Sequence, residues 1–153
     1  MKKLFVLFLV AGYCLTGRAG EPTKSSVVTD AGKMDAKRVD VGTTKARIVL
    51  TNGEIKSIPI EQLSSYSIDG KVFNKVPLYR NGKSTGRTVF MELVKTRDGF
   101  NLYKYEYWDI ESAKPYEKIK TAYLFNRDNF QMQVDEKTLA DVCNFFGLKG
   151  SVE

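Results

Sequence analysis

The sequence predicts an α+β fold, in which an antiparallel sheet of about seven short strands in hairpins is closed by one C-terminal helix packed on it. Two observations lead to this prediction. Turn dipeptides such as Asn52-Gly53 and Asp69-Gly70 separate short runs of β-branched and aromatic residues, which is typical of β-hairpins. Beyond Thr138 the apolar period lengthens from two residues to about 3.6, which indicates a final helix.

The first predicted hairpin joins residues 47–51 to residues 54–58. Asn52-Gly53 lies between them and tolerates positive φ at both turn positions, so we expect a two-residue turn. Pro59 has no N–H to donate and therefore ends the second strand. Residues 59–63 are expected to form one helical turn.

Further strands are predicted through the middle of the chain. Asp69-Gly70 and residues 96–99 read as turns, and residues 80–87 read as a polar loop. Residues 109–120 are polar and contain Pro115, which favours a surface loop. Strand-forming residues flank the Asp69-Gly70 turn at 67–68 and 71–73, and the further segments predicted as strands are 76–79, 89–94, 100–108, 121–125 and 130–134. In the last of these, alternation directs Phe130, Met132 and Val134 inward.

The C-terminal helix is predicted from one apolar stripe. Its members, spaced at i, i+3, i+4 and i+7, are Leu139, Val142, Cys143 and Phe146. Thr138 with Asp141 fits a capping box, and Asp135 is an equally good, earlier N-cap. Gly147 supplies a left-handed C-cap.

Residues 1–19 have the features of a secretory signal peptide. Met1-Lys2-Lys3 is positively charged, and residues 4–15 form an uncharged apolar run. As a helix this run reaches about 18 Å, which is short of the ~30 Å of a bilayer core. We therefore expect cleavage after Ala19, with a cut after Gly20 as a weaker alternative, and export to the periplasm or the medium.

Cys14 offers an alternative to this cleavage, in which the exported protein is a lipoprotein acylated at that cysteine. Bacterial lipoproteins carry a small-residue box that ends in an acylated cysteine, and here Tyr13 before Cys14 fits such a box poorly. Residues 20–45 are rich in Ser, Thr, Gly, Lys and Asp and are predicted to be a flexible linker before an α+β domain at 46–149. The processing site decides whether this linker is a loose tail or a tether to a membrane.

The composition excludes several classes of function. Removal of the signal peptide lowers the formal net charge from +6 to +3, because Lys2, Lys3 and Arg18 leave and no acidic residue does. A charge of +3 without a basic stripe predicts no nucleic-acid partner. The absence of histidine excludes His-dependent triads and HExxH zinc sites, and no metal or cofactor site is predicted. Cys143, on the apolar stripe, is expected to be a buried core residue.

The best candidate for a binding site is a tyrosine face. Tyr103, Tyr105 and Tyr107 alternate along one predicted strand, with Lys104 and Glu106 opposite, and Trp108 follows. An exposed ladder would be a platform for a sugar ring or a protein partner. A buried ladder would be the core face of a half-buried strand, which is the commoner situation.

Three weaker candidates are also present. Gly82-Lys83-Ser84 lacks the earlier glycine and the helix of a phosphate-binding loop, so it is read as a turn. Arg80, Lys83 and Arg87 are read as solvated turn residues rather than as an anion site. No spacing forces together any two of the carboxylates that acid/base catalysis could use, namely Glu92, Glu106, Asp109, Glu111 and Glu117.

Several segments resemble small exported bacterial β-rich proteins of unknown function, in which hairpins precede a helix that ends in paired aromatics. They are residues 73–79 (FNKVPLY), 90–94 (FMELV), 102–105 (LYKY), 123–125 (YLF) and 145–147 (FFG). The resemblance implies a location in the cell envelope and no activity. The sequence therefore predicts a non-catalytic exported binding or scaffold module with an envelope protein or a glycan as partner. A carboxylate-based envelope hydrolase is the alternative.

Overall fold

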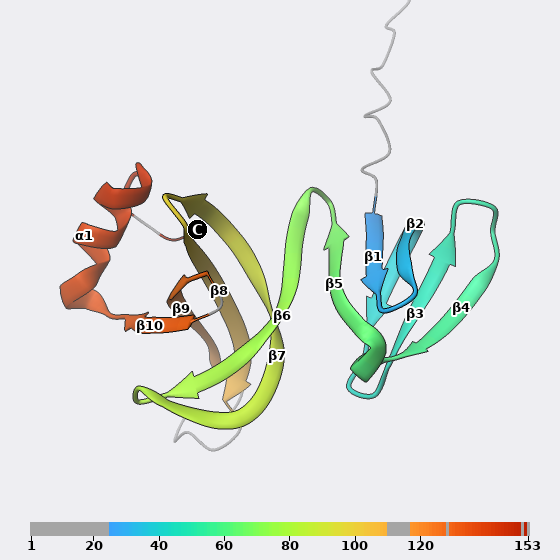
Figure 1. Cartoon of the computed structure of the whole chain (residues 1–153), viewed down its shortest axis with the longest axis horizontal. Helices are drawn as coiled ribbons and strands as arrows, with labels where there is room; N and C mark the ends of the chain where they lie inside the picture. Colours follow the sequence, from blue (N-terminus) through green and yellow to red (C-terminus); the bar gives the residue numbers. More distant parts are fainter. Residues whose placement is uncertain (1–24, 110–116, 128, 151, 153) are drawn as a thin grey trace, which may run out of the picture.

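The computed structural model describes residues 25–109, 117–127, 129–150 and 152, without the side chains of Trp108, Asp109 and Glu117. These residues form ten antiparallel strands in one sheet, in the order β10-β9-β8-β7-β6-β5-β1-β2-β3-β4, followed by one α-helix (Figure 1). The predicted antiparallel sheet and C-terminal helix are confirmed. The predicted number of strands is too low, chiefly because two strands lie within residues 25–41, where a linker was expected.

The sheet has an N-terminal and a C-terminal half, which lie side by side in Figure 1. The N-terminal half contains β1 (Ser25–Thr29), β2 (Gly32–Val41), β3 (Lys45–Leu50), β4 (Ile55–Pro59), the 3-10 helix η1 (Ile60–Gln62) and β5 (Leu63–Ile68). The C-terminal half contains β6 (Lys71–Arg80), β7 (Lys83–Arg97), β8 (Phe100–Asp109), β9 (Glu117–Asn126), β10 (Asn129–Val134) and α1 (Glu136–Phe146). The helical turn predicted at residues 59–63 is confirmed as η1.

The predicted linker is wrong where the structure describes it, because β1 is an interior strand between β5 and β2. Val27 is completely buried and packs with residues of β2, β3 and β5. The domain therefore starts at or before Ser25 and not at residue 46. Composition misled the prediction because the buried face of β1 also carries Ser25 and Thr29, and the Thr29 hydroxyl donates to the Gly32 carbonyl at 3.2 Å.

The turns show which glycine dipeptides make tight hairpins. The dipeptides Asp69-Gly70, Asn81-Gly82 and Asp98-Gly99 have positive φ at both residues, as two-residue type I′ turns require. The polar loop predicted at 80–87 is thus a tight turn followed at once by β7. At Asn52-Gly53 only Gly53 has positive φ, and its N–H bonds to the Leu50 carbonyl at 3.0 Å, so this loop is longer than predicted.

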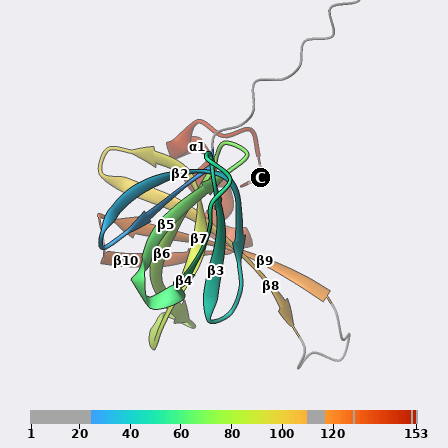
Figure 2. The same ribbon diagram turned by 90° about the vertical axis from the view of Figure 1, so that its right-hand side faces the viewer.

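The C-terminal half curls around an aromatic core made of Leu78, Met91, Tyr103, Tyr123 and Phe125. Its first and last strands meet through side chains, because the Tyr79 ring of β6 stacks on the Phe130 ring of β10 with centroids 4.1 Å apart. The ends of β8 and β9 furthest from α1 extend past the neighbouring strands (Figure 2). The loop predicted at 109–120 is too long, since β9 already begins at Glu117 and pairs with β8.

Helix α1 covers the opposite face of this half, where Val142 and Phe146 pack on Leu102. Cys143 is buried, as predicted. Asp135 is the N-cap: its carboxylate accepts from the Thr138 N–H, and its own N–H bonds to the Thr138 hydroxyl, both at 3.0 Å. The alternative box of Thr138 with Asp141 is therefore wrong, whereas the left-handed C-cap at Gly147 is confirmed.

The prediction that Phe130, Met132 and Val134 all point to one face of β10 is wrong, because β10 contains a β-bulge. The register shifts between Phe130 and Met132, so Phe130 joins the aromatic core while Val134 packs with the helix on the other face. The predicted signal peptide and Cys14 lie outside the described residues. Within those residues, no helix is both long enough and apolar enough to cross a bilayer.

Candidate functional site

Strand β8 places the three predicted tyrosines on one face, because side chains alternate along a strand. Tyr103 is 5% exposed and belongs to the aromatic core, and its hydroxyl accepts a hydrogen bond from the Asn74 amide at 3.1 Å. Tyr105 and Tyr107 are half-buried. Trp108 pairs with β9 through its backbone, but its side chain lies outside the described part. The face is therefore core at Tyr103 and only half-buried at Tyr105 and Tyr107, and its use as a binding platform stays a prediction.

Tyr105 and Tyr107 form a stacked pair at the outer end of β8. Their ring centroids are 5.3 Å apart and their planes differ by 24°. The guanidinium of Arg80, from the tip of the β6–β7 hairpin, lies over the Tyr107 ring at 5.8 Å from its centroid, within reach of a cation–π interaction. We call Tyr105, Tyr107 and Arg80 the tyrosine patch.

Tyr123 forms the inner wall of this patch. Its hydroxyl donates to the Tyr79 carbonyl at 3.1 Å. Burial raises the pKa of Tyr123 above its usual 10.0, the hydroxyls of Tyr107 and Tyr105 raise it further, and the charge of Arg80 opposes them. These groups are therefore near enough to interact electrostatically, and Arg80 is the positive charge among them.

Arg80 has a second cation beside it. The tight Asn81-Gly82 turn sets Arg80 directly opposite Lys83 across the strands. Directly opposite side chains lie on the same face, so Lys83 stands on the side of the sheet that Arg80 shares with Tyr107. Among the residues that the structure describes, no carboxylate forms an ion pair with Arg80 or Lys83.

The sequence identified the tyrosines but not their cation. Arg80 reaches Tyr107 because the sheet curls, and no local sequence pattern predicts a contact between residues so far apart in the chain. The pairing of Arg80 with Lys83 could have been predicted from the sequence, since Asn81-Gly82 is a strong signal for a two-residue hairpin turn. Arg87, grouped with them in the prediction, lies further along β7. Of Gly82-Lys83-Ser84, only Gly82 lies in the turn, because Lys83 and Ser84 already belong to strand β7 and no helix starts there.

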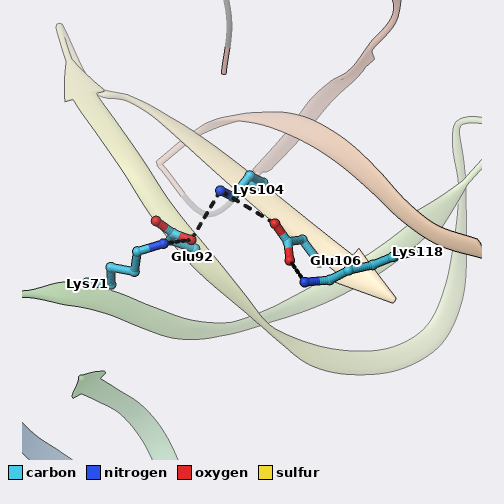
Figure 3. A network of polar contacts seen from close by, with 5 residues as sticks. All are labelled: Lys71, Glu92, Lys104, Glu106 and Lys118. Atoms are coloured by element: carbon cyan, nitrogen blue, oxygen red, sulfur yellow. Dashed lines mark hydrogen bonds and ion pairs between the residues drawn. The ribbon is translucent and has the colours of Figure 1, made fainter. Parts of the chain in front are cut away.

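The opposite face of the sheet carries an ion-pair ladder made of Lys71, Glu92, Lys104, Glu106 and Lys118 (Figure 3). Lys104 lies at its centre with a side chain only 11% exposed, 3.5 Å from the Glu92 carboxylate and 3.6 Å from that of Glu106. Lys71 contacts Glu92 at 3.2 Å, and Lys118 is hydrogen-bonded to Glu106. Every charge in the ladder therefore has a partner.

The ladder brings together two of the carboxylates considered for catalysis. The hydrogen bond from Lys118 holds the pKa of Glu106 below its ordinary value. Burial opposes this effect, and the positive charges of Lys118, Lys104 and Lys120 act in the same direction as the hydrogen bond. Glu106 is thus suited to remain ionised, whereas a general acid needs a raised pKa. Asp109 and Glu117 are backbone partners whose side chains are not described, and Glu111 lies outside the described residues.

Two hollows open on the ladder face. One of about 330 Å³ lies over the ladder and is also lined by Tyr66, Phe73 and Phe90. The other, of about 460 Å³, lies between the start of α1 and β9 and is lined partly by Ala122, Val134 and Leu139. Among the residues that the structure describes, no three His, Cys, Asp or Glu side chains lie together in a way that could hold a metal ion.

No family model, no curated protein and no solved structure matches the chain. The resemblance to small exported bacterial proteins stays a prediction from its short segments. On the ladder face the charges neutralise one another, and on the tyrosine face two cations stand without a described carboxylate partner.

Proposed function

We propose that this chain is a non-catalytic binding module of the cell envelope or the medium, and that the tyrosine patch is its binding surface. The observation that carries the proposal is the half-buried Tyr105–Tyr107 stack with Arg80 over its outer ring. Tyrosine combines a large apolar ring with a polar edge, which is why it is enriched at binding surfaces. The partner class is a glycan or an envelope protein.

A free sheet edge is the other surface that could take a partner. Strand β4 is the outer strand of the N-terminal half, and Ile55 on it is 56% exposed. This edge is short, ends at Pro59 and carries Lys56, and such features protect an edge strand against pairing with another chain. The tyrosine patch has no comparable protection, so it is the better supported of the two surfaces.

The proposed location follows from residues 1–19. Cleavage after Ala19 releases the module to the periplasm or beyond, and acylation at Cys14 would anchor it in a membrane. Because β1 begins at Ser25, the chain from Cys14 spans at most about 40 Å. A lipid anchor would therefore hold the sheet close to the membrane surface, and the mass of the mature N-terminus distinguishes the two forms.

Co-sedimentation with an insoluble envelope fraction tests the proposed function. We expect the mature protein to pellet with the fraction, and the double variant Tyr105→Ala/Tyr107→Ala to stay in the supernatant. Phe145→Ala is the matched control, since it removes a partly exposed aromatic from α1 on the other face. Equal pelleting of wild type and double variant would rule out the patch, and a wild type that never pellets would contradict the binding module.

Release of soluble fragments from the fraction would instead favour the hydrolase. That activity would have to disappear in Glu106→Gln, because Glu106 is the described carboxylate that Lys104 and Lys118 hold ionised. The lowered pKa suits Glu106 to be the ionised member of a carboxylate pair, and the hydrolase would also need a protonated carboxylate beside it.

A further inference from the structure

We infer that the tyrosine patch, together with Lys83, takes an acidic polysaccharide whose sugar rings carry carboxylates. This inference rests on the proposed function and specifies its ligand. Two cations lie opposite each other at the tip of the β6–β7 hairpin, and an aromatic surface lies beside them.

The tip of the hairpin holds two like charges in register. Arg80 and Lys83 are direct cross-strand partners, and like charges in that position destabilise a hairpin. Elsewhere in the same sheet lysines are matched with glutamates, as Lys71 is with Glu92 at 3.2 Å. In the described part of the chain, Arg80 and Lys83 have no such match. An anion bound between Arg80 and Lys83 would offset the repulsion between their charges.

The two cations complement each other chemically. The planar guanidinium of Arg80 can bind a carboxylate through two parallel N–H groups, whereas the Lys83 ammonium acts as a point charge. Both side chains are exposed, so an anion reaches them without rearrangement of the fold. The anion would then lie next to the Tyr107 ring, over which Arg80 is already held.

The aromatic surface favours a sugar as the carrier of that anion. Because the Tyr105 and Tyr107 rings stack on each other and Arg80 lies over Tyr107, the half-buried pair offers a pyranose the apolar side of the stack, and the two hydroxyls are hydrogen-bonding groups at its rim. A single-stranded nucleic acid would be better served by a longer basic groove with separate stacking rings. The patch instead pairs one aromatic stack with one pair of cations, which fits a uronic-acid unit.

The inference is tested with defined probes on the mature chain, residues 20–153. By calorimetric titration we expect an oligogalacturonate to bind about tenfold more tightly than a neutral malto-oligosaccharide of the same length, and the difference to shrink as salt is added. Arg80→Gln/Lys83→Gln should abolish this preference. The matched control Lys45→Gln/Arg47→Gln removes two exposed cations from β3 and should leave the preference unchanged.

A second readout separates binding from folding. The double glutamine variant removes a like-charge pair but also the contact of Arg80 with the Tyr107 ring, and these two effects oppose each other, so its melting temperature should stay close to that of the wild type. If uronate and neutral sugars bind equally well, the inference about charge is overturned while the binding module stands. Tighter binding of oligo(dT) than of the uronate would overturn the sugar assignment. If no sugar binds while envelope pelleting still depends on the tyrosines, the ligand is a protein and the inference fails.

Discussion

At the scale of single residues, polar side chains that enter the core bring their own partners. The Tyr123 hydroxyl donates to the Tyr79 carbonyl, and the Tyr103 hydroxyl accepts from Asn74. Within the described residues, no buried side-chain nitrogen or oxygen lacks a hydrogen bond. Satisfied polar groups can therefore lie in this core at little cost, although unsatisfied ones would be strongly destabilising. This explains how a tyrosine-rich strand serves both the core and the surface.

Asp135 gives a testable pH dependence at this scale. Hydrogen bonds from the Thr138 N–H and hydroxyl hold the pKa of Asp135 below its ordinary 3.8. The folded state thus binds this proton less readily than the unfolded state. The resulting stability is present in full above the ordinary pKa and is lost as the pH falls through the lowered one.

We therefore expect Asp135→Asn, which keeps a capping side chain, to melt with a weaker pH dependence than the wild type between about pH 5 and about pH 2. Thermal denaturation at a series of pH values, followed by circular dichroism, measures this pH dependence of the melting temperature. Asp141→Asn makes the same chemical change within α1, away from the cap, and should retain the wild-type slope. An unchanged slope in Asp135→Asn would show that the cap does not contribute to acid sensitivity.

At the scale of elements, the strands that were predicted correctly have local signals and those that were missed do not. Asp69-Gly70 and Asp98-Gly99 encode tight turns by themselves, and the stripe of α1 is visible from its period. Strand β1 carries mostly Ser, Val and Thr and is an interior strand only because β2 and β5 pair with it. Pairing over such a distance leaves no local pattern, so composition suggested a linker.

Val27 tests whether β1 belongs to the core. Val27→Ala should lower the free energy of unfolding by about 2 kcal/mol, because it removes buried methyl groups and leaves a cavity. The neighbouring Val28 lies on the other face of β1 and is only half-buried, so Val28→Ala should lower the free energy of unfolding by less. Urea denaturation of both variants makes the comparison. Equal, negligible effects would mean that residues 25–29 are a linker after all.

At the scale of the whole molecule, the described part of the sheet joins an N-terminal core to two cores on opposite faces of the C-terminal half. The N-terminal core around Val27 and the aromatic core around Tyr103 share no buried residue. Side chains connect the halves at the β5–β7 junction, where the Tyr66 ring stacks on Phe73 at 4.7 Å and meets Phe90 edge-on at 5.2 Å. This junction was not predictable, since it joins residues of three strands that sequence reasoning placed only locally.

Phe90 tests how tightly the halves are coupled. We expect the wild type to unfold in one calorimetric transition, with equal calorimetric and van't Hoff enthalpies. Phe90→Ala should lower stability by about 3 kcal/mol and broaden or split the transition, because the halves then lose a shared contact. Two resolved transitions in the wild type would show that the halves fold independently. The control Phe145→Ala, a partly exposed ring on α1, should leave a single transition.

The candidate site depends on this whole-molecule arrangement, because curling of the C-terminal half brings Arg80 to Tyr107. The most direct measurement of the central claim is therefore a map of the bound surface. In a ¹⁵N–¹H spectrum of the mature chain titrated with oligogalacturonate, the account predicts that amide shifts concentrate at residues 80–83 and 105–107. Shifts centred on β4 or α1, or no shifts at saturating probe, would contradict it.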